Sequence, residues 1–255
     1  MTPEAFTALA AQGYNRIPVS TEVLADLETP ISAYRKLAVG PYSFRVESVQ
    51  GGEKWGRYSI ICLPFRVVLS VSVKQVDILE DGELIHSETV DDTLAFVDSF
   101  QSRYRAAPVD DLPVFHGGLV GYFGYDTVRY VEPRLAPSVP DDELGTPYIL
   151  LMLADEVLVF DNLAGTIRLV VNADPAVEDA YELARERLDQ LVEQLPKPVP
   201  PLAAVSLTGA DSSLLEEQAE SHFTQPVYEA AVDKVKEYVL AGDVMQVVPS
   251  QRMSI

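Results

Sequence analysis

The sequence has few residues that could crosslink the chain or bind a transition metal. Its 255 residues include one cysteine and three histidines, and the histidines lack the spacing of metal ligands. A single cysteine cannot form an intrachain disulfide, which fits a reducing cytoplasm. Cys62 lies in the apolar run 60–63, so we expect a buried, unreactive thiol. We therefore expect no disulfide within the chain and no metal site.

Basic residues are also scarce, with 19 Lys and Arg against 39 Asp and Glu and a net charge of −20. Such a surface repels phosphate backbones and anionic lipids, which argues against nucleic acid or a membrane as a partner. No apolar run approaches the roughly 20 residues of a membrane-spanning helix. The first residues lack the basic start and apolar stretch of a signal peptide.

Helix and strand signals alternate along the chain. Pro near the start and Gly after the end predict helices at 3–12 and 30–39, and apolar spacing predicts others at 92–104, 177–195 and 224–241. Strands are expected at 43–48, 57–63, 67–79, 84–90, 117–123, 148–160 and 166–171. Asp81-Gly82 predicts a tight hairpin. Several hairpins with helices between them indicate an antiparallel α+β fold.

The chain divides near residue 200. Residues 1–195 read as one domain, and the proline-rich, then acidic and aperiodic, stretch 196–222 reads as a linker. Residues 224–255 read as a capped helix, ended by Gly242, and a strand that begins at Val244. A helix and strand that begin a unit with nothing behind them suggest a chain cut just inside its second half.

One polar, glycine-rich segment could bind a small zwitterion. Residues 47–59 hold Glu47 and Ser48 at a strand end, followed by Lys54 and Arg57. The acid could take an ammonium group and a base could pair with a carboxylate. The alternative is a solvated hairpin loop.

Two other features carry less chemistry. Gly117 to Gly124 is dense in glycine, but no helix pattern follows it, so close backbone packing is a better explanation than a phosphate cradle. No nucleophile and base occur together in a recognisable pattern. The paired acids at 91–92, 110–111 and 141–142 are typical of helix caps and turns.

Four segments resemble the anthranilate synthase component I family, which converts chorismate to anthranilate, and residues 13–18 resemble its pseudomonad form. The segments are Glu47-Ser48 with Gly-Gly-Glu-Lys-Trp-Gly-Arg-Tyr-Ser, Gly-Gly-Leu-Val-Gly-Tyr-Phe-Gly-Tyr-Asp at 117–126, the hairpin 149–161, and Ala-Gly-Asp-Val-Met-Gln-Val-Val-Pro-Ser-Gln-Arg at 241–252. The resemblance implies an antiparallel β-sandwich with outer helices, here truncated. Residues 1–195 would be the regulatory domain, and 224–255 the start of the chorismate-binding domain.

The resemblance also implies a feedback site for tryptophan. Its residues would be Glu47, Ser48 and Arg57, with the ammonium on the acid. Arg45-Val46 stand where the family has Leu-Leu, which changes the wall of that pocket, and Arg45 is expected on the opposite face of the strand.

The resemblance implies one residue of the catalytic region, Gln246. Water-adding relatives have a lysine base there, whereas a Gln amide cannot take a proton at neutral pH, so it fits attack by ammonia. Without the resemblance, Gln246 is equally a strand residue satisfying its own amide. The family uses Mg²⁺, chorismate and a glutamine amidotransferase subunit. Because the chorismate and Mg²⁺ ligands lie beyond this chain, we expect no cofactor and no activity from it alone.

Two other functions remain open. One is aminodeoxychorismate synthase component I, the folate-pathway relative that uses the same substrate. The other is a non-catalytic module that binds an amino acid or docks a subunit.

Overall fold

The computed structural model describes residues 1–47, 56–139, 142–199, 201 and 219–254. The chain forms two compact units, Met1–Pro200 and Pro201–Ile255.

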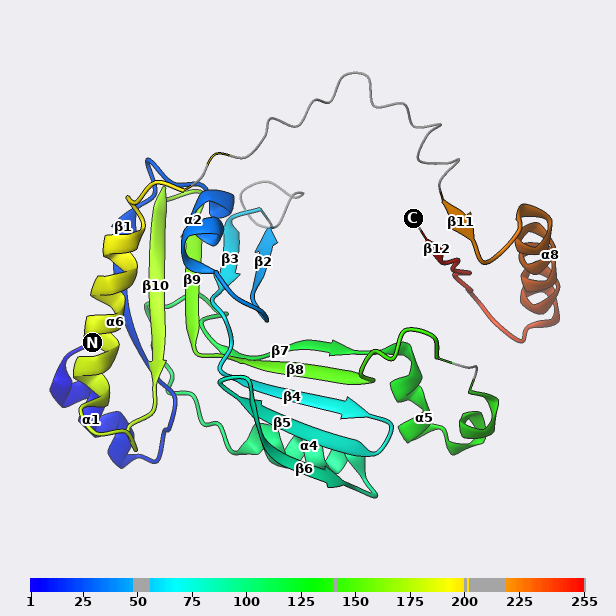
Figure 1. Ribbon diagram of the computed structural model, residues 1–255, viewed down its shortest axis with the longest axis horizontal. Coiled ribbons are helices and arrows are strands. Elements are labelled where there is room, and N and C mark those ends of the chain that lie inside the picture. Colours follow the sequence, from blue (N-terminus) through cyan, green and yellow to red (C-terminus); the bar gives the residue numbers. More distant parts are fainter. Residues whose placement is uncertain (48–55, 140–141, 200, 202–218, 255) are drawn as a thin grey trace. The chain divides into compact units, whose positions relative to one another are not determined.

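The first unit contains two antiparallel sheets of five strands each (Figure 1). In the first sheet the strand order is β1 (Ile17–Leu24), β10 (Thr166–Ala173), β9 (Glu156–Asp161), β3 (Tyr58–Cys62) and β2 (Phe44–Glu47). One face of this sheet packs against α1 (Pro3–Ala11), α2 (Pro30–Leu37) and α6 (Ala180–Gln194). The core there is aliphatic, with Leu158, Ile167, Leu169, Leu188 and Leu191 almost fully buried.

The second sheet has the order β6 (Glu83–Thr89), β5 (Gln75–Glu80), β4 (Val67–Ser72), β8 (Ile149–Ala154) and β7 (Gly118–Phe123). Helix α4 (Thr93–Ser102) buries Val97 and Phe100 against it. Three short helical segments follow β7: η1 (Tyr125–Thr127), α5 (Val128–Val131) and η2 (Pro133–Ser138). A third apolar cluster joins the two sheets through Cys62 and Val157 from the first and Val68 and Ala154 from the second.

The predicted starts of α1, α2 and α4 are confirmed by side-chain caps, whereas the helix expected from 177 begins at Ala180 and the cap expected at the start of α8 (Gln225–Ala241) is wrong, because Thr224 makes no side-chain cap hydrogen bond. The Thr2 hydroxyl accepts the Ala5 N–H, and Thr29 and Ser32 form a reciprocal capping box at α2. The Asp92 carboxylate accepts the Ala95 N–H at the start of α4. The mixture of helices with purely antiparallel sheets confirms the predicted α+β class.

Two expected strands are each two strands in the structure. Residues 67–79 turn back at Val73, which has φ of 57°, so β4 and β5 form a hairpin. Residues 148–160 are interrupted at Asp155, where the chain passes from β8 in one sheet to β9 in the other. Each break coincides with a pair of polar residues, Lys74-Gln75 in the first case and Asp155-Glu156 in the second, but neither pair contains the Gly or Asn that usually marks a turn.

The packing explanation of the glycine-rich strand is confirmed. A Cβ at Gly121 would lie 1.8 Å from the Leu150 carbonyl oxygen, and one at Gly117 would lie 2.4 Å from Asn172 Nδ2. At Gly121 the backbone of the paired strand β8, and at Gly117 the Asn172 side chain, lie too close for a side chain to fit. Cys62 is buried as expected, and burial raises the pKa of its thiol to about 12.

The second unit contains α8 (Gln225–Ala241) and a two-stranded pair, β11 (Glu220–Ser221) with β12 (Met253–Ser254). Gly242 ends α8 in the left-handed conformation, as predicted. The strand expected from Val244 is wrong over most of its length, because only Met253–Ser254 finds a pairing partner among the described residues. No helix of the described chain is long and apolar enough to cross a membrane.

Candidate functional site

The predicted zwitterion-binding residues lie at one end of the β2–β3 hairpin, at the edge of the first sheet. Glu47 is the last residue of β2 and pairs with Ser59 of β3, while Arg57 directly precedes β3. The register therefore brings Glu47 and Arg57 to the same end of two neighbouring strands. Ser48, the third predicted residue, lies outside the described residues.

The Glu47 carboxylate is held by the arginine two residues earlier on its own strand. Arg45 Nη1 lies 2.7 Å from Glu47 Oε2, and the two side chains are 30% and 37% exposed. Residues i and i+2 of a strand share a face, so the expectation that Arg45 points away from Glu47 is wrong. The charged heads of both residues remain open to solvent at the sheet edge.

The Arg57 guanidinium is bound to Asp161, the last residue of β9. Arg57 Nε lies 3.0 Å from both carboxylate oxygens, and the Tyr58 ring lies 4.9 Å from the guanidinium carbon. Asp161 also accepts the backbone N–H groups of Leu163 and Ala164, which closes the β9–β10 turn. Hydrogen bonding from Arg57 lowers the pKa of Asp161, and the same contact raises the pKa of Arg57.

The strand register places the two predicted binding residues, Glu47 and Arg57, on opposite faces of the sheet. Glu47 is opposite Ser59, and Ser59 is opposite Phe160, on the face that packs against the helices. Tyr58 is opposite Asp161, on the other face. The Arg57 guanidinium joins that second face, where it lines a groove of about 350 Å³ with Tyr58, Asp161 and Arg168.

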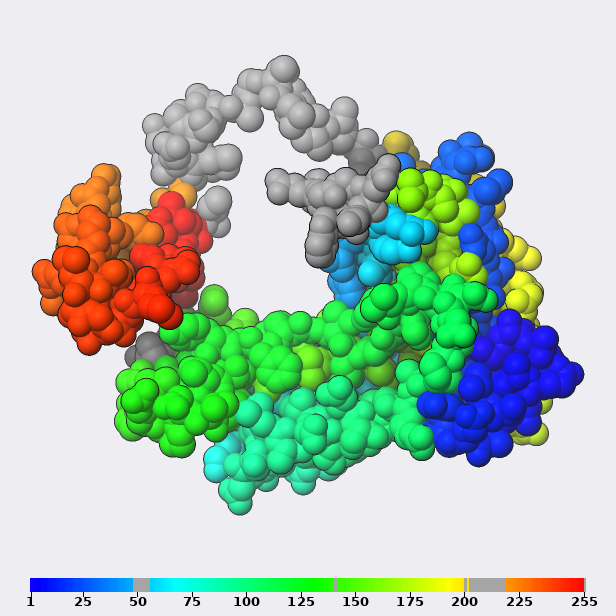
Figure 2. Space-filling view, turned by 180° about the vertical axis from the view of Figure 1, so that it is seen from behind, coloured from blue at the N-terminus to red at the C-terminus, as the bar shows by residue number. Residues whose placement is uncertain are grey.

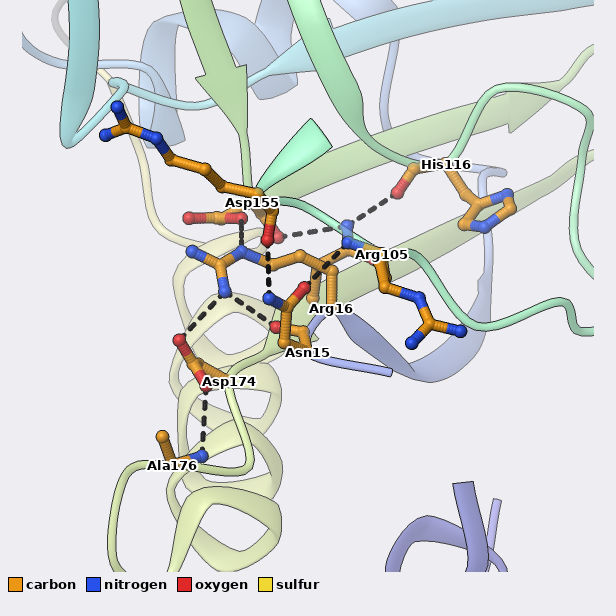
Figure 3. A network of polar contacts seen from close by, with 9 residues as sticks. Asn15, Arg16, Arg105, His116, Asp155, Asp174 and Ala176 are labelled. Carbon is orange, nitrogen blue, oxygen red and sulfur yellow. Dashed lines mark hydrogen bonds and ion pairs between the residues drawn. The ribbon is translucent and has the colours of Figure 1, made fainter. Parts of the chain in front are cut away.

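A second polar centre lies where the two sheets meet, around Arg16 and Asp155 (Figure 3). Arg16 Nε donates to Asp155 Oδ1 at 3.1 Å, and its Nη1 donates to Asp174 at 2.9 Å. The guanidinium also lies over the Tyr104 ring at 4.9 Å. These contacts join the start of β1 to the end of α4, the β8–β9 junction and the end of β10.

Asn15 extends this network through the backbone. Its side chain donates to the Arg103 carbonyl at 2.6 Å and accepts the Arg105 N–H at 2.7 Å. The N-terminal segment, in blue, accordingly lies directly against the segment that follows α4 (Figure 2). The network is therefore a structural junction of four chain segments.

Asp155 is the electrostatically unusual member of the network. Burial raises the pKa of its carboxyl to about 6, although Arg16 opposes that rise. Its side chain is 27% exposed and borders a cavity of about 570 Å³, which is also lined by Arg66, Glu156 and Arg187. Arg187 and Glu156 form a two-point ion pair with both distances at 2.8 Å, and Arg66 is bound to Asp81. The cavity walls thus carry charges that already neutralise one another.

Gln246 lies in the second unit, exposed and outside any helix or strand. Nothing in its surroundings assigns it a role. Among the described residues no group of three or more His, Cys, Asp or Glu side chains could hold a metal ion.

Sequence reasoning missed Arg16, Asp155 and Asp161 as organising residues. A charged pair, Asp155-Glu156, interrupts an otherwise apolar run, and this was the one available signal of a break between strands. Asp161 carried a turn signal, because it precedes Asn162 and Gly165, but its partner is 104 residues away and could not be inferred locally.

Comparison with known proteins gives consistent matches. The model of the family described as chorismate binding enzyme matches residues 51–255, across both units. Anthranilate synthase component 1 of Pseudomonas putida is 55% identical over 255 residues, and that of Neisseria meningitidis serogroup B is 46% identical over 258. Each match covers 100% of this chain and 51% of the relative, so the chain spans about half the length of these relatives and matches the N-terminal half.

A solved structure shares the fold. The crystal structure of anthranilate synthase component I from Streptococcus pneumoniae TIGR4 matches with a TM-score of 0.58 at 24% identity. The match covers 91% of this chain and 48% of that chain.

Proposed function

From the premise that this chain belongs to the chorismate binding enzyme family, we propose that it is the N-terminal part of an anthranilate synthase component I. The observation that carries the proposal is 55% identity along the whole chain to the Pseudomonas putida protein of that name. The complete enzyme would convert chorismate and ammonia to anthranilate and pyruvate, as a lyase of tryptophan biosynthesis in the cytoplasm. A glutamine amidotransferase subunit would supply the ammonia.

The proposed contribution of this chain is regulatory. Residues 1–195 would form the regulatory domain, 196–222 a linker and 224–255 the start of the chorismate-binding domain, which the division of the chain near residue 200 supports. The two antiparallel sheets would form part of a β-sandwich completed by the rest of the enzyme. We expect no anthranilate synthesis from these 255 residues alone.

The tryptophan effector would bind at the end of the β2–β3 hairpin, at the site that includes Glu47, Ser48 and Arg57. Glu47 suits the ammonium group because its carboxylate is partly exposed and its present partner, Arg45, is also open to solvent. An amino acid could therefore reach it without opening the core.

Gln246 would contribute to the choice of ammonia over water. Its amide has no pKa near neutrality, so it cannot activate water as a base, whereas neutral ammonia needs no activation. The described residues of this chain do not fit a Mg²⁺ site.

The test joins residues 1–255 to the C-terminal half of the Pseudomonas putida relative. With chorismate, ammonium and Mg²⁺, we expect fluorescent anthranilate to form and tryptophan to inhibit its formation. The C-terminal half alone is the control. An inactive joined protein, beside an active one built from the relative's own halves, would favour a non-catalytic binding module instead.

A second measurement tests the effector site. Glu47→Gln should weaken tryptophan inhibition about tenfold by removing the charged partner of the ammonium, whereas Glu83→Gln on exposed strand β6 should not change it. Calorimetry should also show weaker tryptophan binding to residues 1–255 alone than to the joined protein. Equal affinities would contradict a site shared with the missing half.

A further inference from the structure

We propose that Arg45, and not Arg57, binds the carboxylate of the amino-acid effector, and that Arg57 is a positioning residue. The inference rests on the proposed effector site. An α-amino acid carries its ammonium and carboxylate on one carbon, so the acid and base that bind them must lie within a few ångströms on one surface. Among the described residues at this end of the hairpin, Arg45 and Glu47 meet that condition.

The geometry of Arg45 and Glu47 fits a zwitterion. Their charged atoms are 2.7 Å apart, they project from the same face of one strand, and about a third of each side chain is exposed. An incoming ammonium can pair with Glu47 while the adjacent carboxylate pairs with Arg45, so each charge exchanges one partner for another. Such an exchange leaves no charge unpaired.

Strand β2 also lies at the edge of its sheet among the described strands. Its outer side therefore presents backbone groups that a strand partner does not occupy. A ligand at Arg45 and Glu47 can lie along this edge, beside the side chains that bind its two charges.

Arg57 lacks the freedom that a ligand-binding residue needs. Its side chain is 39% exposed, but both oxygens of Asp161 accept from it, its guanidinium lies over the Tyr58 ring, and it lies on the face opposite Glu47. A ligand carboxylate would have to displace Asp161 from Arg57 and leave that acid without its cationic partner, held only by the backbone N–H groups of Leu163 and Ala164. The contact instead fixes the start of β3 to the end of β9, and thereby positions the hairpin that carries Glu47.

The experiment compares three ligands by calorimetry on the 255-residue chain: L-tryptophan, tryptamine, which lacks the carboxylate, and indole-3-propionate, which lacks the ammonium. We expect Arg45→Met to weaken tryptophan binding about tenfold and to leave tryptamine binding unchanged or stronger. Glu47→Gln should reduce the preference for tryptophan over indole-3-propionate. Arg57→Met should change affinities for tryptophan and tryptamine by the same factor.

Arg168→Met is the matched control. Arg168 pairs with Glu22 in the same sheet, and these side chains are 29% and 38% exposed, nearly the values of Arg45 and Glu47. It lines the groove on the opposite face with Arg57, so it reports whether the ligand binds there. Circular dichroism would establish that each variant is folded.

The outcomes separate the two proposals. If the unaltered chain binds tryptophan but Arg45→Met keeps the ratio of tryptophan to tryptamine affinity, the role of Arg45 is wrong and the effector site stands. A lower ratio of tryptophan to tryptamine affinity in Arg57→Met or Arg168→Met would also overturn the proposed role of Arg45. If the unaltered chain does not bind millimolar tryptophan, the same variants are compared in the protein joined to the C-terminal half of the relative. If that joined protein does not bind tryptophan either, the effector site and the role of Arg45 both fail.

Discussion

Replacement of Asp155 by Asn should change how the stability of the first unit depends on pH. Asp155 lies at the one-residue junction between the two sheets, and its carboxyl pKa is raised from 3.8 to about 6. Because the folded-state pKa lies above the unfolded one, the fold favours protonated Asp155. Its contribution to stability is therefore fully present below about pH 4 and is lost as the pH rises through about 6.

The size of the effect follows from the pKa change. A rise of the pKa from 3.8 to about 6 means that folding is about 3 kcal/mol more favourable with Asp155 protonated than with Asp155 ionised. The side chain is 27% exposed, and solvent screening reduces this to about 2 kcal/mol. Asn cannot ionise, so the variant lacks this pH-dependent loss.

The assay is urea unfolding followed by circular dichroism at several pH values from 4 to 7.5. The free energy of unfolding of the unaltered chain should fall by about 2 kcal/mol relative to Asp155→Asn over this range, mostly below pH 6. Arg16→Met should enlarge the loss and extend it to higher pH, because Arg16 lowers the pKa of Asp155. Parallel pH profiles for the unaltered chain and Asp155→Asn would refute the reasoning.

Three further predictions concern packing and backbone conformation. Gly121→Ala should destabilise the first unit by about 3 kcal/mol in the same urea assay, since its Cβ would lie 1.8 Å from the Leu150 oxygen. Gly82→Ala should cost about 1 kcal/mol, because a Cβ there meets open space but the φ of 85° disfavours a side chain. Val73→Gly should raise the unfolding free energy by about 1 kcal/mol by relieving a positive φ at a side chain that is 57% exposed; a loss of stability would contradict this. Cys62 should react with a thiol reagent only after denaturation, because it is buried and its pKa is raised to about 12; rapid labelling of the folded chain would disprove that burial.

Much of the fold could be predicted from local sequence because its signals are local. Pro at a helix start, a carboxylate cap and Gly after the end each act within one turn of helix, so α1 and α2 begin at the expected prolines and α4 begins directly after the acid pair 91–92. Asp81-Gly82 likewise formed the expected hairpin, with both residues at positive φ.

The breaks between strands were not predictable in the same way. A turn at Val73 requires a β-branched residue in a conformation it disfavours, which only the surrounding sheet can impose. The break at Asp155 depends on the chain leaving one sheet for another. The charged pair Asp155-Glu156 marks an interruption of the apolar run, but it does not indicate that the two halves belong to different sheets.

At the candidate effector site, too, the sequence determined some features and the tertiary structure decided others. By itself the sequence determined which residue types were present at the hairpin, and the family resemblance singled out Glu47 and Arg57. That Arg45 shares a face with Glu47 follows from alternation along the predicted strand 43–48, whereas the tertiary structure decided that Arg57 lies on the opposite face, bound to Asp161. Which face a side chain occupies depends on strand pairing, and pairing joins residues about a hundred positions apart, such as Arg57 and Asp161, whose contact has no local trace.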